Sequence, residues 1–201
     1  MENKKGWIGK LLTEFISVVF AVLLALGLNH WREANNDEKL AEKALVNIFL
    51  EIQANQKEVE AEIPSYDEQI AEVKVFKDAF DKGEGMPYSL GFNMPVLSRS
   101  AWNVANSTGA IKDFDLNMLM ELSDIYTFQE MYHNNGVNYM LSMHSVDAKK
   151  DENAKAIVDS NYGQLKTFKH WSIQLSAIYQ EFIKTYGSQY KELLPDSVLV
   201  E

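Results

Sequence analysis

The chain of 201 residues contains no cysteine. Disulfide bonds, thiolate nucleophiles and cysteine-ligated metal sites are therefore excluded, although the compartment stays open because many envelope proteins also lack cysteine. The P-loop, the dinucleotide-binding fingerprint and the nucleophile elbow are missing too. No motif consequently indicates an enzyme, and we expect no catalytic residue, no metal site and no cofactor.

Basic residues are also few. Lys and Arg total 19 against 29 Asp and Glu, which gives a net charge of −10. Three of the lysines, Lys4, Lys5 and Lys10, lie close to the N-terminus, so the rest of the chain carries the acidic excess. A surface of this charge repels phosphate backbones, and we expect no nucleic-acid partner.

The alternating apolar and polar pattern of a β-strand is absent as well, whereas a period of about 3.6 residues recurs. Hydrophobic residues make up 46% of the chain, enough for a core. The sequence therefore predicts an all-α fold, in which an N-terminal transmembrane helix continues into an antiparallel helical bundle. We expect a cytoplasmic tip and anchor at residues 1–32 and a helical extracytoplasmic domain at residues 33–201.

One long apolar run, residues 15–28, carries no charge and only one hydroxyl group, that of Ser17. With its N-terminal flank it forms a stretch of 21 residues, 8–28, long enough at about 1.5 Å per residue to cross about 30 Å of hydrocarbon. A cleaved signal peptide, ending near Gly27, and a buried core helix are the alternatives. We favour a membrane span, because the helical pattern continues past Gly27 and no other segment is apolar enough to surround the run.

The flanks of the run fit a bilayer boundary. Trp7 and Trp31 stand where an interfacial aromatic belt is expected. Glu14 lies one helical turn after Lys10, so it is either a functional carboxylate in the membrane or, as we favour, an interfacial partner of Lys10. The short basic N-terminus favours a cytoplasmic N-terminus and a domain outside the inner membrane of a bacterium.

An apolar stripe follows the run and predicts one continuous helix from about Trp7 to Ile63, with Pro64 ending it and a capping box at residues 65–68 opening a second helix. The stripe consists of Ala41, Leu45, Ile48, Ile52, Asn55 and Val59. The opposite, charged face is assigned Glu42, Lys43, Glu51, Lys57 and Glu58.

The remaining helices and loops are predicted from capping residues, glycines and prolines. Asp115 is the predicted N-cap of a helix, with Phe114 stapling Leu119. The other expectations are a loop at residues 83–95, a short helix at 96–106 that breaks before Gly109, a possible interruption at 134–136, a charged hinge at 147–152 and a last helix that stops by Pro195.

Three features away from the membrane, two single residues and one motif, suggest functional hypotheses. Asn55, inside the apolar stripe, could set the register of a paired helix. Trp102 could line a pocket or a partner groove, although a core position is favoured. Glu130 and His133 form a single E-x-x-H motif, whereas a di-iron bundle needs two, so we expect no metal site.

The chain also resembles a widespread bacterial family of uncharacterised single-span membrane proteins. The resemblance lies in Glu14, Phe15 and Ile16, then Ala25 and Leu26, then Asn29, His30, Trp31, Arg32 and Glu33, and later in residues 50–55, 100–102, 107–109, Leu122, Tyr126 and Gln129. It implies a single-pass envelope protein with a helical outer domain. It implies no activity, because none is assigned to the family.

Two functions are compatible with these features. The first is a non-enzymatic scaffold or protein–protein interaction module of the envelope, with the bilayer and either an envelope protein or a second copy of the chain as partners. Its candidate interaction residues are Glu14, Asn29, Trp31, Asn55 and Trp102. The alternative is a sensor bundle that binds a small molecule near Trp102, Tyr126, Trp171 and Tyr179 and signals through a partner.

Overall fold

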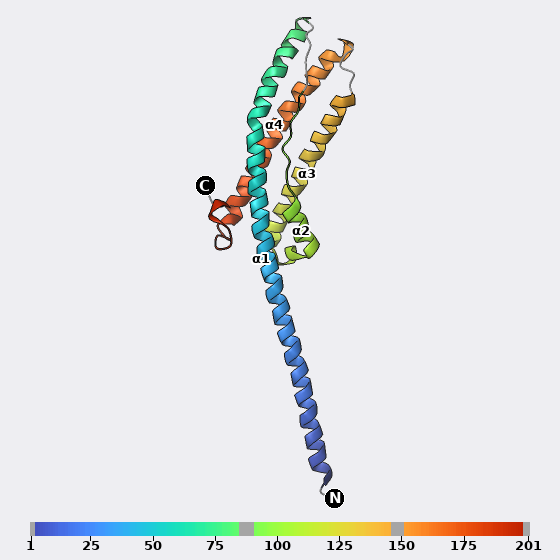
Figure 1. Ribbon diagram of the computed structural model, residues 1–201, viewed down its shortest axis with the longest axis vertical. Coiled ribbons are helices and arrows are strands. Elements are labelled where there is room, and N and C mark those ends of the chain that lie inside the picture. Colours follow the sequence, from blue (N-terminus) through green and yellow to red (C-terminus); the bar gives the residue numbers. More distant parts are fainter. Residues whose placement is uncertain (1–2, 85–90, 146–150, 199–201) are drawn as a thin grey trace.

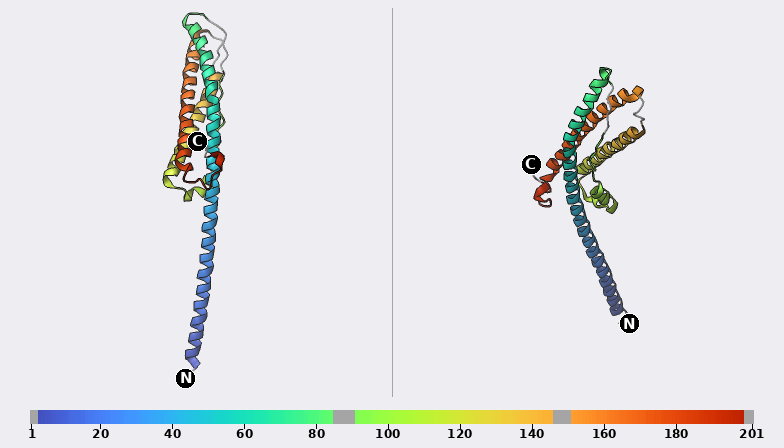
Figure 2. Two further views of the ribbon diagram at one scale, coloured as in Figure 1. Left: turned by 90° about the vertical axis from the view of Figure 1, so that its left-hand side faces the viewer. Right: turned by 45° about the horizontal axis from the view of Figure 1, so that its top comes forward.

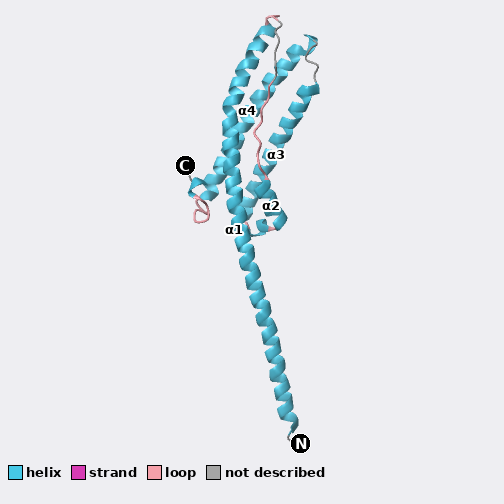
Figure 3. Ribbon diagram, in the orientation of Figure 1, coloured by secondary structure: helices cyan, strands magenta, loops and turns pink. Residues whose placement is uncertain are grey.

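The computed structural model describes residues 3–84, 91–145 and 151–198. These residues form four helices and two short 3-10 turns, without a strand among them, which confirms the all-α prediction (Figure 3). The elements are α1 (Asn3–Asp81), α2 (Ser100–Thr108), η1 (Ala110–Asp113), α3 (Leu116–Ser145), α4 (Asp151–Gly187) and η2 (Asp196–Val198).

The helix α1 is a rod of 79 residues, about 120 Å long at about 1.5 Å per residue. Its C-terminal half packs against α4, which runs in the opposite direction, and α3 lies beside α4 at the edge of the bundle (Figure 1). The short helix α2 and the turn η1 lie beside the middle of α1. The N-terminal part of α1 stands clear of the bundle in every view (Figure 2).

The prediction that α1 ends at Pro64 is wrong, because the helix continues through this residue to Asp81. Ser65 does not cap a second helix, and its hydroxyl accepts a hydrogen bond from Gln69 Nε2 at 2.9 Å. Proline removes one backbone hydrogen bond, but Pro64 faces solvent, while Val59 and Tyr66 are buried on either side of it. Tertiary packing on the inner face therefore outweighs the local break.

Between α1 and α2 the chain returns through the bundle as an extended strand-like stretch without helical structure, residues 91–99, which we call the crossing segment. Phe92 packs its ring on that of Phe168 in α4, with ring centroids 4.7 Å apart, and Pro95 is buried. The predicted short helix therefore begins at Ser100, four residues later than expected. Its predicted break is confirmed, because Gly109 ends α2 with a φ of 75°.

The predicted start of α3 is confirmed as well. Asp115 Oδ1 accepts hydrogen bonds from the backbone N–H groups of Asn117 and Met118, at 2.9 and 3.1 Å. The helix then passes through residues 134–136 without interruption. Gly136 is buried there, and a Cβ atom at this position would lie 2.1 Å from the sulfur of Met94. This glycine therefore allows the crossing segment to approach α3 rather than ending the helix.

The last helix ends before Pro195, as expected, but it begins inside the predicted hinge. Residues 151 and 152 are already helical in α4, whereas residues 147–150 of that hinge lie outside the described residues. Of the loop predicted at residues 83–95, residues 83–84 and 91–95 are described and are not helical.

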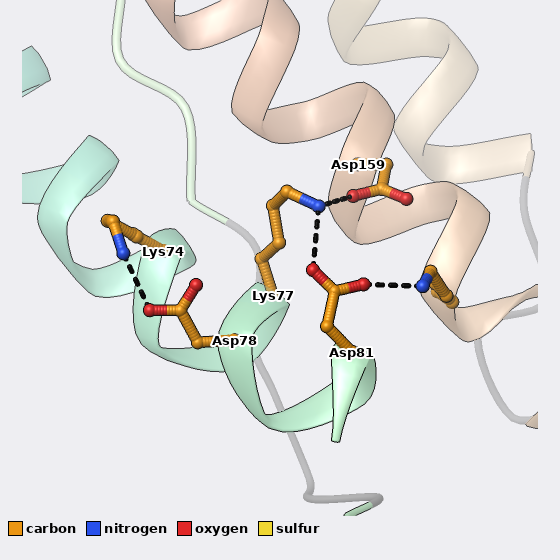
Figure 4. A network of polar contacts seen from close by, with 6 residues as sticks. Lys74, Lys77, Asp78, Asp81 and Asp159 are labelled. Carbon is orange, nitrogen blue, oxygen red and sulfur yellow. Dashed lines mark hydrogen bonds and ion pairs between the residues drawn. The ribbon is translucent and has the colours of Figure 1, made fainter. Parts of the chain in front are cut away.

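The far ends of α1 and α4 are joined by a chain of ion pairs (Figure 4). Lys77 Nζ lies 2.7 Å from Asp159 of α4 and 3.1 Å from Asp81, and Asp81 also pairs with Lys155 of α4. Hydrogen bonds to these two aspartates raise the pKa of Lys77 to about 12. Because the pairs face solvent, they align the two helices more than they stabilise them.

Candidate functional site

The crossing segment is held by a largely buried polar cluster, which we call the polar node: Glu51, Asn55, Ser98, Tyr126, Gln129 and Tyr179. All of these residues are buried except Ser98, which is exposed. Its members come from α1, α3, α4 and the crossing segment. Buried polar groups require hydrogen-bond partners, and in the node these partners come from segments far apart in the sequence.

Glu51 supplies the carboxylate of the node. Its Oε2 atom accepts hydrogen bonds from the Ser98 hydroxyl at 2.6 Å and from the N–H of Ala101 at 2.9 Å. Its Oε1 atom accepts from the Tyr126 hydroxyl at 2.7 Å and from the N–H of Trp102 at 3.3 Å. Glu51 thus caps the N-terminus of α2 from another helix, where the helix dipole favours negative charge.

This placement corrects the assignment of Glu51 to the charged outer face of α1. The residue is 8% exposed. The sequence could not reveal its role, because the N–H groups that it caps lie 50 residues further along the chain. Arg99, the residue at the N-cap position of α2, makes no capping hydrogen bond with its side chain.

Asn55 and Gln129 bind the backbone of Ser98. The Ser98 N–H donates to Asn55 Oδ1, and Asn55 Nδ2 donates to the Ser98 carbonyl, both at 2.8 Å. Gln129 Nε2 donates to the same carbonyl at 2.9 Å, and the Tyr179 hydroxyl donates to Gln129 Oε1 at 2.9 Å. The amide of Asn55 is therefore engaged within the chain. Its use in pairing two chains stays a prediction.

A second row of hydroxyl groups crosses the core nearer the far end of the bundle. The Tyr66 hydroxyl lies 3.0 Å from the Tyr132 hydroxyl, which lies 3.0 Å from that of Ser172 in α4. Tyr66 also bonds the carbonyl of Asn93 in the crossing segment at 3.0 Å. Burial raises the pKa of Tyr66 and Tyr132 above the usual value. These phenols stay protonated at neutral pH and act as structural hydrogen-bonding groups.

Trp102 lies at the rim of the node and is half-buried. Its ring stacks on that of Tyr126, with the centroids 5.1 Å apart and the planes inclined by 10°. Tyr126 and Tyr179 are fully buried with their hydroxyl groups bonded. Two of the candidate residues, Asn55 and Trp102, are thus brought together around α2.

The other candidates, Glu14, Asn29 and Trp31, lie far from the node. All three are exposed on the projecting part of α1, and the 26 residues from Asn29 to Asn55 span about 39 Å of helix. The predicted pair of Glu14 with Lys10 involves a side chain outside the described ones. The Glu130 carboxylate of the E-x-x-H motif pairs with Arg99 at 2.6 Å, and His133 is exposed.

An open groove of about 600 Å³ lies where α1 leaves the bundle. Leu45, Phe114 and Tyr190 supply apolar lining, and five acids surround them: Glu33, Asp37, Glu38, Glu42 and Asp113. Lys112 also lines the groove and pairs with Asp37. The charge of the groove favours a basic occupant.

No protein-family model, curated protein or solved structure matches the chain. The resemblance to single-span envelope proteins therefore stays a prediction.

Proposed function

We propose that the chain is a single-pass protein of the bacterial inner membrane, with a cytoplasmic N-terminus and an extracytoplasmic helical bundle. The bundle is a non-enzymatic module for protein–protein interaction, held close to the bilayer surface. The proposal rests chiefly on the projecting part of α1.

Among the described residues, α1 alone is long and apolar enough to cross a membrane. Its apolar run, residues 15–28, packs against nothing in the described chain, and the large side chains of the run are 39–67% exposed. Burying one such side chain is worth about 1.5–3 kcal/mol, so ten exposed together in water would be a large cost. A lipid environment removes this cost, and a continuous helix satisfies the backbone within it.

An interaction role is supported by how the polar groups of the bundle are used. The carboxylate of Glu51 and the amides of Asn55 and Gln129 are buried and bonded to the crossing segment. They fix the shape of the bundle and leave its outer faces to make contacts. The anchor then restricts those contacts to partners in or beside the same membrane.

Membrane fractionation of cells tests the proposal. The full-length chain should stay in the membrane pellet after an alkaline carbonate wash. The double variant Leu23→Lys, Leu26→Lys places two charges in the centre of the run, at about 2.5–3.5 kcal/mol each, and should shift the protein to the aqueous fraction. A native chain released by carbonate would contradict the proposal.

The matched control is Val75→Lys, which adds a charge at an exposed apolar position of the same helix, outside the run. This variant should stay in the pellet.

The orientation of the chain in the membrane can be determined with Ser188→Cys, since the natural chain has no cysteine and Ser188 is exposed. An impermeant maleimide should label it from outside in spheroplasts, and labelling only after lysis would reverse the proposed topology.

A further inference from the structure

The outward face of α3 has no charged residue over eight successive positions. In a helix, residues on one face recur every three or four positions, and the eight positions follow this spacing over seven turns. They are Leu116, Met120, Ser123, Thr127, Met131, Asn134, Asn138 and Leu141, and we call them the α3 stripe.

The α3 stripe lies opposite the buried face of the same helix, which carries Met118, Leu122, Ile125 and Gln129. All eight side chains of the stripe are exposed, and its four large apolar members are 51–68% exposed. Figure 1 shows α3 at the edge of the bundle, and the exposure of all eight residues agrees with a side of α3 that the described chain leaves uncovered. Thr127 donates its hydroxyl to the Ser123 carbonyl at 2.7 Å, which satisfies this group within the helix.

We propose that the α3 stripe is the contact surface for a second copy of this chain, in a parallel two-fold dimer on the membrane. This inference rests on the proposed function, because the anchors of two copies in one bilayer align both bundles in the same direction. A two-fold axis parallel to α3 then places each residue of the stripe close to its own equivalent in the partner copy.

Charge favours this occupant. In a self-paired helix every charged residue of the contact would meet its own like charge, which is destabilising. The acids of α3 stand beside the stripe instead, at Glu121, Asp124 and Glu130. With a net charge of −10 two copies repel each other overall, and a contact that carries no charge of its own adds nothing to this repulsion. An uncharged stripe is the surface on which two acidic copies can meet.

The size of the surface is that of a modest interface. Burying a Leu or Met side chain is worth about 1.5–3 kcal/mol, and each Å² of apolar surface contributes about 25 cal/mol. One such side chain therefore buries about 60–120 Å². Four such residues in each of two copies give about 500–1,000 Å², to which the four polar positions add, and a specific interface needs about 1,000 Å². Confinement to one membrane raises the effective concentration of the partner, so an interface of this size is sufficient.

Single-cysteine crosslinking of the full-length chain in native membranes tests the inference, because the natural chain has no cysteine. Thr127→Cys lies in the middle of the stripe and should give a disulfide-linked dimer under mild oxidation. Asn135→Cys is the matched control, since it is also exposed on α3 but turned about 80° from the centre of the stripe. Its yield should be about tenfold lower at equal membrane content, because disulfides need Cβ atoms about 4 Å apart.

A second variant distinguishes a weakened contact between two copies from unfolding of the chain. Adding Met131→Glu to Thr127→Cys buries two like charges at the contact and should lower the crosslink yield about tenfold or more. The helical circular dichroism and the carbonate-resistant membrane fraction should not change, since Met131 is exposed. Equal yields for Thr127→Cys and Asn135→Cys in a membrane-bound protein would overturn the dimer alone. A protein found in the aqueous fraction would overturn the anchor, and with it the parallel pairing.

Discussion

The variant Glu51→Ala is expected to lose about 4 kcal/mol of the free energy of unfolding. The carboxylate accepts hydrogen bonds from two hydroxyl groups and two backbone N–H groups, and alanine leaves these donors without their acceptor. Each buried unsatisfied group costs about 1–3 kcal/mol, reduced where water can enter. Because domains are stable by only about 5–15 kcal/mol, this single change removes a large share of the total.

The conservative variant Glu51→Gln removes the carboxylate but keeps the size of the side chain, so it measures the loss of hydrogen-bond acceptors without a cavity. Its amide has a similar shape, but its NH₂ group would face donors, so we expect a loss of about 2–3 kcal/mol. Glu58→Gln is the control, because Glu58 is exposed on the same helix and should change stability by less than about 0.5 kcal/mol. Urea unfolding of the full chain in detergent, followed by circular dichroism, measures both. Equal stability of the two glutamine variants would show that Glu51 does not support the bundle.

Alkaline unfolding is the second large effect, and we expect it to begin just above pH 10. Burial raises the pKa of the five most deeply buried core tyrosines in the folded state, whereas in the unfolded chain each titrates at about 10. The contribution of the protonated phenols to the free energy of unfolding is therefore complete below pH 10. It is lost as the pH rises from 10 toward the pKa values of the folded state. The five residues are Tyr66, Tyr126, Tyr132, Tyr139 and Tyr179.

Each of these phenols lowers the free energy of unfolding by about 1.4 kcal/mol per pH unit above pH 10, or about 7 kcal/mol per unit for all five. Helical circular dichroism should disappear within about two pH units, and the phenolate absorbance should rise in the same transition. Tyr139→Phe removes one titrating group and should move the midpoint to higher pH. Phenolate absorbance that rises fully before any loss of helix would contradict the buried hydroxyl network.

The parts of the fold that sequence analysis predicts correctly are set by local chemistry. Asp115 caps the helix that begins directly after it, and Gly109 ends the helix before it with a positive φ. The apolar stripe of α1 becomes core because its spacing alone selects one face. In the two capping cases the interacting groups lie within a few residues of each other, and in the stripe the regular spacing itself marks the buried face.

The parts that fail are set by distant contacts. Pro64 is tolerated inside α1 because the inner face of the helix is packed on both sides of it. Glu51 lies in the core because Ser98 and the N-terminus of α2 come to meet it, about 50 residues later. Residues 96–99 are extended rather than helical because Asn55 and Gln129 bind the backbone of Ser98. Periodicity carries no information on such partners.

The central claim, that the projecting part of α1 spans the membrane, is tested most directly by measuring the depth of successive positions along this helix. Single cysteines at successive positions from Thr13 to Leu45, each carrying a spin label, report collision with oxygen in lipid and with a nickel chelate in water. The account predicts labels in lipid throughout residues 18–28, a change to water near Trp31, and periodic burial from Ala41 onward as the bundle begins. Labels exposed to water along the whole of residues 15–28 in membrane-reconstituted protein would contradict it.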